Sequence, residues 1–273
     1  MENFPARAPR LIASDIDGTL LDRNHRVPRR NRDAVARAVQ QGAYFALSTG
    51  RPFRWIAPVL EQLPVRPVCV TSNGAVLYDS AEDRVMSAHE LSPAALAEVV
   101  DVAQTVLGTV GFGAERAGGS LADAVEDLFV VERHYSENAL FEGFGVVSMG
   151  ELVGQPAVKF LIRNTDYSAP ELYELIAPHI DPELAHLTYS MQEGILEVAA
   201  PNVTKRRGVE WLAEHAGVAQ QETIAFGDMP NDIEMLQWAG CGVAMENAHP
   251  EVKAAADAVT VANHQAGVAK VLE

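Results

Sequence analysis

Residues 11–22 read LIASDIDGTLLD, an apolar run that ends in two aspartates before a glycine. The apolar part has the composition of a buried strand, and Asp and Gly favour a turn directly after it. Because side chains alternate along an extended segment, Asp15 and Asp17 lie on the same face and repel each other. The segment therefore predicts a strand whose last residues either hold a cation or carry out chemistry.

Strand-like and helix-like segments alternate through the first quarter of the chain. The expected strands are residues 10–16, 43–50 and 66–74. The expected helices are residues 31–42 and 52–63. A proline at position 58 is expected to kink the second helix. Alternation of this kind is typical of a Rossmann-like α/β fold, a parallel sheet with helices on both faces.

The pattern changes after residue 74 and returns near Thr204. Between them, a hairpin around residues 80–83 and further strands and helices predict an inserted α+β domain. From Thr204 onward, helices and strands alternate again to the end of the chain. We therefore predict an α/β core domain at residues 1–82 and 192–273, interrupted by an α+β domain at residues 83–191.

The formal net charge of −16 excludes several classes of partner. An acidic surface repels nucleic acid and anionic membranes. A binding site for an anionic ligand on such a protein needs local cations, a metal or helix N-termini. Six arginines between Arg23 and Arg37 run against the overall charge, and we interpret them as the solvated face of a helix with Ala34 and Val35 on its buried side.

Cysteine usage and hydropathy indicate the compartment. Cys69 and Cys241 both stand in apolar runs, which predicts buried thiols and a reducing environment. The first ten residues contain no apolar segment typical of a signal peptide, and no apolar run is long enough to cross a bilayer. The expected location is the cytoplasm, and the sequence carries no pattern that predicts an oligomeric state.

Four expected strands end in polar motifs, which read SDIDGT, STGR, TSNG and FGDMPND. In open α/β sheets ligands bind at the carboxyl ends of the strands, so these motifs are expected to meet. The last motif adds Asp228, Asn231 and Asp232 to the aspartates at positions 15 and 17. Four carboxylates at one edge of a sheet suit Mg²⁺, which takes hard oxygen ligands and bridges to phosphate.

The motifs DIDGTLLD, LSTGRP, TSNGA, GDMPNDIEML and NAHPEVKAAADAVT, with Lys205 before a helix, extend over nearly the whole chain. In these features the chain resembles the haloacid dehalogenase-like superfamily, and within it the Cof-type sugar-phosphatase group. The resemblance implies that the inserted domain is a C2-type cap. It also implies a Mg²⁺-dependent phosphatase that acts on small phosphorylated metabolites.

The resemblance implies a role for each aspartate. Asp15 would attack phosphorus and form an aspartyl-phosphate. Asp17 would be the general acid and base, and its backbone carbonyl would also bind Mg²⁺. Asp228 would be the third metal ligand of the protein, and Asp232 would be a further ligand or would support the others.

Other residues would bind phosphate. Thr49 and the amide of Gly50 would hold phosphate oxygens, Lys205 would neutralise the nucleophile and the transferred group, and Asn231 would donate a hydrogen bond nearby. Arg51 would either bind phosphate or fix its loop. Asn73 would contact substrate, although Asn and Gly also form turns.

The sequence departs from the pattern of the group at two positions. Arg206 follows the motif lysine where glycine is common, and Glu246 stands where glycine is frequent. Neither belongs to the implied catalytic set, but Arg206 affects what can be inferred about the substrate.

Two other functions remain open at this stage. A phosphomutase or phosphotransferase of the phosphomannomutase type shares the DxDGT motif, and a non-catalytic metabolite-binding protein could share the fold. Within the inserted domain we consider Glu132, Arg133, His134 and Lys159 as residues that select the substrate. The sequence favours a simpler interpretation for them, in which all four side chains face water.

Overall fold

The computed structural model describes residues 8–189 and 191–273, so residues 1–7, which include most of the segment examined for a signal peptide, and residue 190 lie outside the described part. The chain divides into two compact units, which we call the first unit (Met1–Met86 and Thr204–Glu273) and the second unit (Ser87–Val203). Within the described residues, no helix is both long enough and apolar enough to span a membrane.

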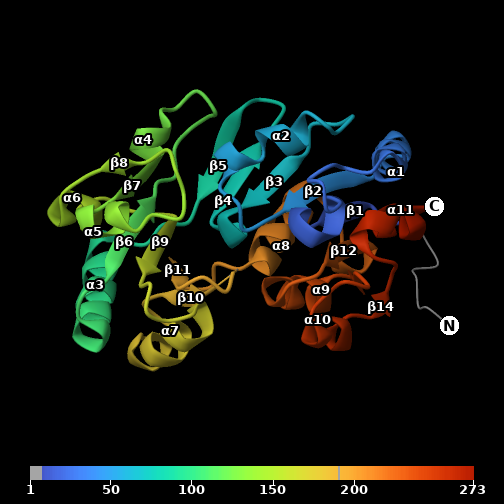
Figure 1. Ribbon diagram of the computed structural model, residues 1–273. Helices are drawn as coiled ribbons and strands as arrows, with labels where there is room; N and C mark the ends of the chain where they lie inside the picture. The colour runs from blue at the N-terminus through green and yellow to red at the C-terminus, as the bar shows by residue number, and fades with distance from the viewer. Residues whose placement is uncertain (1–7, 190) are drawn as a thin grey trace. The chain divides into compact units, whose positions relative to one another are not determined.

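The first unit is built on an eight-stranded sheet (Figure 1). In sheet order the strands are β14 (Ala258–Val259), β13 (Cys241–Ala244), β12 (Thr223–Gly227), β1 (Leu11–Ser14), β2 (Tyr44–Ser48), β3 (Val68–Thr71), β4 (Val76–Asp79) and β5 (Arg84–Ala88). The strands from β14 to β3 pair in parallel, and β4 pairs antiparallel with β3. From β1 the chain adds strands on one side through β2 and β3, and later on the other side through β12 and β13. The topological switch point therefore lies between β1 and β12.

Helices cover both faces of this sheet, as the alternating sequence predicts. They are α1 (Arg29–Gln40), α2 (Ala57–Leu60), α8 (Lys205–Ala216), α9 (Ile233–Trp238), α10 (Pro250–Ala255) and α11 (Gly267–Leu272). Apolar residues of α8, α9 and α10 share one buried cluster with alternate residues of the central strands, among them Leu11 and Ala13. The helices α1 and α11 pack together around Ala34 and Ala269. The α/β fold class is therefore confirmed.

Some predicted helices and strands differ from the observed ones. The helix expected at residues 52–63 is replaced by a short 3₁₀ turn, Phe53–Trp55, and the four-residue α2, because Pro58 fits only the first turn of a helix. Around α1, the prediction holds: Ala34 and Val35 are buried, and Arg30 and Arg37 lie on the exposed side, where both pair with Glu273.

The second unit contains a six-stranded, mostly antiparallel sheet. In sheet order the strands are β10 (His186–Thr188), β11 (Ile195–Ala199), β9 (Lys159–Arg163), β6 (Gly111–Glu115), β7 (Phe129–Val131) and β8 (Gly145–Val146). The helices are α3 (Pro93–Leu107), α4 (Val125–Leu128), α5 (Arg133–Glu137), α6 (Met149–Val153) and α7 (Ala169–Ile176). The α3 helix packs against α6 and α7, α7 packs against β11, and α5 packs against β6.

The predicted boundary between residues 191 and 192 assigns β11 to the α/β core. In the structure β11 pairs with β9 and β10, inside the second sheet. Its apolar sequence fits either sheet, and only its antiparallel partners decide the assignment.

Candidate active site

Two neighbouring parallel strands bring the DIDGT and GDMPND motifs together. Asp15 follows β1, and its backbone N–H donates to the carbonyl of Phe226 on β12 at 3.0 Å. Asp228 follows the last residue of β12. Since parallel strands end at the same edge, Asp15 and Asp228 meet at the switch point of the sheet although the chain separates them by more than 200 residues.

The turn after β1 depends on a glycine. Gly18 has φ +77°, and a Cβ there would lie 2.1 Å from Oδ2 of Asp228. Two polar side chains fix this turn: Thr19 Oγ1 donates to Asp228 Oδ1 at 2.8 Å, and Asn247 Nδ2 donates to the carbonyl of Gly18 at 2.8 Å. Position 18 therefore requires glycine, because any side chain there would collide with the carboxylate of Asp228.

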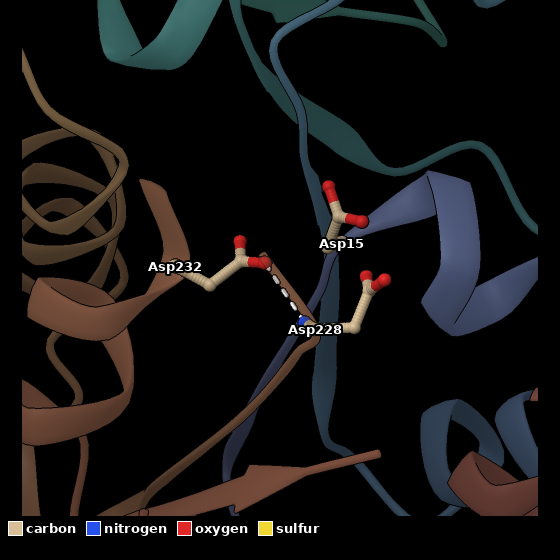
Figure 2. Close-up of side chains that lie close together, drawn as sticks. All are labelled: Asp15, Asp228 and Asp232. Atoms are coloured by element: carbon tan, nitrogen blue, oxygen red, sulfur yellow. Dashed lines mark hydrogen bonds between the residues drawn. The ribbon is translucent and has the colours of Figure 1, made fainter. Parts of the chain in front are cut away.

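Three carboxylates converge at this edge. Oxygens of Asp15, Asp228 and Asp232 all lie within 4.8 Å of one another, and the three residues are buried. Figure 2 shows Asp15 and Asp228 turned toward a shared space, with Asp232 reaching the backbone N–H of Asp228 from the other side. Hard oxygen donors so close together fit a divalent cation such as Mg²⁺.

Lys205, the first residue of α8, is the cation of this cluster. Its side chain is 2% exposed, and its Nζ donates to Asp15 Oδ1 and Asp232 Oδ1, both at 2.7 Å. Thr204 caps the helix by accepting a hydrogen bond from the backbone of Arg207. The structure thus brings Lys205 to the predicted nucleophile.

Asp232 differs from its two neighbours in how its oxygens are used. Its Oδ1 accepts from Lys205, and its Oδ2 accepts from the backbone N–H groups of Asp228 and Met229 at 2.9 and 3.0 Å. These bonds tie the loop after β12 to α8. Asp232 therefore orients Lys205 and Asp228, whereas Asp15 and Asp228 present oxygens toward the shared space.

Burial shapes the electrostatics of the cluster. Desolvation, with the nearby carboxylates of Asp232 and Asp228, raises the pKa of Asp15, while Lys205 acts against this rise. Desolvation and the charge of Asp232 raise the pKa of Asp228 to about 6. Burial opposes the charge of Lys205, but attraction to Asp15 and Asp232 outweighs it, so the pKa of Lys205 lies above its usual value. Such an excess of buried negative charge favours a bound cation.

Asp17 lies apart from the three carboxylates. Its side chain is 49% exposed and forms two hydrogen bonds with Arg51, from Nε at 2.7 Å and from Nη2 at 2.5 Å. The sequence predicts four converging carboxylates, and among the described residues the cluster holds three. The side chain of Asp17 is instead paired with Arg51.

The loops after β2 and β3 are bound to each other through their backbones. Asn73 N–H donates to the carbonyl of Thr49 at 3.0 Å, and Thr49 Oγ1 accepts from the N–H of Arg51 at 3.1 Å. Asn231 Nδ2 donates to Asn73 Oδ1 at 3.0 Å, while a Cβ on Gly50 would lie 3.1 Å from the same oxygen. Thr49, Gly50, Asn73 and Asn231 therefore form one group beside the carboxylates.

Several polar atoms around these loops are buried without a hydrogen-bond partner in the described part of the chain. They are Ser48 Oγ, Ser72 Oγ and Asn231 Oδ1. Buried polar atoms that lack partners are costly, so their concentration beside one strand edge indicates a place for polar ligand atoms.

Thr19, Asn247 and the backbone contacts of Asp232 were not predicted in these roles. Thr19 belongs to the DIDGT motif, and its position two residues beyond Asp17 is a usable signal. Asn247 gives no local signal, because its contact with Gly18 joins segments far apart in the chain.

The four residues considered in the second unit have other partners. Glu132 is the N-cap of α5 and accepts from the backbone N–H groups of Phe112, His134 and Tyr135. Arg133 forms an exposed pair with Glu137, and His134 is partly exposed. Lys159 is 9% exposed and donates to Glu197 at 2.8 Å. The expectation that Glu132 and Lys159 face water is wrong, because one caps a helix and the other is ion-paired inside a sheet.

Arg206 and Glu246, the two departures from the pattern of the group, have other surroundings than the carboxylate cluster. Arg206 pairs with Glu210 one turn along α8, and Glu246 is exposed. Neither residue hydrogen-bonds to the carboxylate cluster in the described structure.

Comparison with known proteins gives a consistent result. The family described as haloacid dehalogenase-like hydrolase matches residues 12–272. The chain is 28% identical over 273 residues to 5-amino-6-(5-phospho-D-ribitylamino)uracil phosphatase YitU of Bacillus subtilis, covering 97% of each protein. It is 26% identical to the HMP-PP phosphatase of Cronobacter sakazakii, covering 93% of this chain and 90% of that protein. The fold is similar to that of BT1666 from Bacteroides thetaiotaomicron, a phosphatase of the HAD superfamily, with a TM-score of 0.81, 21% identity and coverage of 100% and 98%.

Proposed function

This chain belongs to the haloacid dehalogenase-like hydrolase family and is a phosphoric monoester hydrolase, and from that premise we propose a Mg²⁺-dependent reaction through an aspartyl-phosphate on Asp15. The substrates are small phosphorylated metabolites. The names of the two curated relatives, which act on a ribitylaminouracil phosphate and on HMP-PP, support this class.

The observation that carries the proposal is the setting of Asp15. It is buried, 2.7 Å from Lys205, and shares a space with Asp228 at the ends of adjacent strands. A carboxylate in this setting is held in one orientation and can approach phosphorus along one line. Phosphoryl transfer depends mainly on such alignment and on stabilising charge.

The phosphate group of the substrate would meet one cationic donor and several neutral donors, although the protein as a whole is acidic. Lys205 supplies the positive charge, and the hydroxyl of Thr49, the amide of Gly50 and the side chain of Asn231 supply hydrogen bonds. Asn73 holds Asn231 in place through their mutual hydrogen bond. These groups lie on loops that are fixed to each other, so they need little reorganisation during the reaction.

The reaction has two displacements. In the first, an oxygen of Asp15 bonds to phosphorus, the bond to the leaving oxygen breaks, and Asp17 gives that oxygen its proton. In the second, Asp17 takes a proton from water, the water oxygen bonds to phosphorus, and the bond to Asp15 breaks. Inorganic phosphate leaves, and both aspartates regain their starting states.

The donor set fits Mg²⁺. The carboxylates of Asp15 and Asp228 and the backbone carbonyl of Asp17 would hold the ion, with Asp232 orienting them. When bound, Mg²⁺ supplies positive charge to the phosphoryl oxygens.

The direct test is release of phosphate from p-nitrophenyl phosphate with Mg²⁺ and with EDTA. We expect release only with Mg²⁺, and none from Asp15→Asn. Asp33→Asn is the matched control, because Asp33 is an exposed aspartate on α1. Phosphate transfer to a second sugar hydroxyl instead of water would identify a phosphomutase.

Full activity in Asp15→Asn would contradict the aspartyl-phosphate. Absence of turnover from Mg²⁺-loaded, folded protein with p-nitrophenyl phosphate and a panel of phosphorylated sugars and cofactors would instead support the binding-protein alternative.

A further inference from the structure

We infer that Arg51 is a positioning residue that acts through Asp17 and does not bind the phosphate. This inference rests on the proposed function, in which Asp17 transfers the proton to and from the reacting oxygens. It replaces the two roles considered from sequence, a phosphate ligand or a brace for the loop.

The contact between the two side chains is bidentate. Arg51 Nε donates to Asp17 Oδ2 at 2.7 Å and Nη2 donates to Oδ1 at 2.5 Å. A planar guanidinium matches a carboxylate in this geometry and fixes the carboxylate plane as well as its position. Each carboxylate oxygen keeps a further lone pair, where Asp17 can carry the proton that it gives to the leaving oxygen and later takes from water.

Arg51 itself is anchored on both sides. Its backbone N–H donates to Thr49 Oγ1, its carbonyl accepts from Ser72 N–H at 2.9 Å, and its Nη1 lies 3.4 Å from the carbonyl of Trp55. The side chain is 24% exposed, half as much as that of Asp17. Arg51 is therefore the more firmly held member of the pair.

The other aspartates of the site have different supports. Lys205 holds Asp15, Thr19 holds Asp228, and backbone N–H groups hold Asp232. Asp17 stands just before Gly18 on an open turn, and its carboxylate is half exposed. Arg51 fixes the orientation of the Asp17 carboxylate, as the lysine, hydroxyl and backbone donors do for the buried aspartates.

The same contact makes a phosphate-binding role unfavourable. Nη1 of Arg51 lies 3.4 Å from the carbonyl of Trp55, and the fork formed by Nε and Nη2 already points at Asp17. Binding phosphate through this fork would release Asp17 at the moment when the reaction needs its proton. A positioning role keeps both groups in place.

The test compares two substrates in single-turnover, rapid-quench experiments. p-Nitrophenolate leaves without a proton, whereas the alkoxide of glucose 6-phosphate needs one. In Arg51→Ala we expect aspartyl-phosphate formation from glucose 6-phosphate to slow by about 100-fold, as a misplaced reacting group does. With p-nitrophenyl phosphate we expect the p-nitrophenolate burst to persist and the steady rate after it to fall, because water attack also needs Asp17.

A double-mutant cycle shows whether Arg51 acts through Asp17. In the Asp17→Asn background, Arg51→Ala is expected to cause no further loss. Arg51→Lys should restore part of the rate, since lysine supplies the charge but not the fork. Arg54→Ala is the matched control, as Arg54 is a neighbouring arginine that stacks over Trp55.

Three results would overturn the inference. A slower burst with p-nitrophenyl phosphate together with weaker inhibition by inorganic phosphate would make Arg51 a phosphate ligand. Equal losses in the wild-type and Asp17→Asn backgrounds, with a lower melting temperature, would make it a brace for the loop. An Arg51→Ala enzyme as fast as wild type on glucose 6-phosphate would give Arg51 no role.

Failure of the proposed function gives a different signature, namely a wild-type protein that releases phosphate from neither substrate. The crystal structure of Arg51→Ala then still tests whether Arg51 orients the carboxylate of Asp17, because this contact does not depend on turnover. A changed rotamer of Asp17 supports positioning, and an unchanged rotamer overturns it.

Discussion

Each unit of this protein contains a buried lysine paired with a carboxylate, and the two lysines stand in different kinds of backbone. Lys205 lies 2.7 Å from Asp15 and Asp232, where strands end and a helix begins. Lys159 lies 2.8 Å from Glu197, within the strands of the second sheet. At strand ends, backbone N–H groups and loop side chains are available to a ligand, whereas inside a sheet the ladder already uses them. We therefore expect the ion pair at the strand ends to serve the reaction and the ion pair inside the sheet to serve stability.

The largest effect that we expect is the loss of turnover in Lys205→Met. Lysine donates directly to the proposed nucleophile, and loss of one such stabilising donor lowers kcat by about 10²- to 10³-fold. The measurement is kcat with p-nitrophenyl phosphate at saturating Mg²⁺. Lys270→Met, which alters an exposed lysine on α11, should keep the wild-type rate. An active Lys205→Met enzyme would place this lysine in a structural role.

The counterpart, Lys159→Met, should affect stability instead. Removing one partner of a buried pair leaves Glu197 without this lysine, which costs about 3–5 kcal/mol of unfolding free energy. Urea unfolding gives this value, and the rate per folded molecule with p-nitrophenyl phosphate should change little. The double variant Lys159→Met/Glu197→Leu should regain most of the stability, because an apolar pair of similar volume avoids the desolvation cost. A lost rate with unchanged stability would make Lys159 a functional residue.

The same comparison shows what the sequence could predict. The convergence of Asp15 and Asp228 was predicted because strand ends followed by Asp, Gly and Asn give a local signal, and the parallel sheet brings those ends together. Lys205 stands at a helix start and gives little local signal, and only the resemblance to the family implied its place near Asp15. The burial of Lys159 was missed because alternation along a strand distinguishes two faces without showing that both are covered. The pairing of Asp17 with Arg51 was missed for another reason: it depends on how two separate loops pack, which neither loop's sequence contains.

The stability of the buried cluster around Lys205 should depend on pH. Burial raises the pKa of Asp228 to about 6, so the folded state binds its proton more tightly than the unfolded state does. The free energy of unfolding from this group therefore falls as pH rises from about 4 to about 6. In EDTA at pH 7, Asp228→Asn should be more stable than wild type by about 3 kcal/mol, a difference that vanishes near pH 4.

Urea unfolding of both proteins between pH 4 and 7 measures this difference, with Asp33→Asn as the exposed control. Added Mg²⁺ should reverse the order at pH 7, because a ligand stabilises only the protein that binds it. If Asp228→Asn proved no more stable than wild type at pH 7 in EDTA, burial would not raise the pKa of Asp228.

The smallest expected difference in stability separates two glycines of the first unit whose φ angles are positive. Gly18 has φ +77° and faces Asp228, whereas Gly217, the C-cap of α8, has φ +60° and a Cβ there would meet nothing within 4 Å. Alanine at either position costs about 1–2 kcal/mol because of the left-handed backbone. In Gly18→Ala the new carbon would also displace the carboxylate of Asp228, so we expect Mg²⁺-dependent turnover to fall only there. Thermal unfolding and kcat measured on both variants separate the shared backbone cost from the local one. Equal turnover in the two variants would mean that the close approach of Gly18 to Asp228 serves the turn and not the reaction.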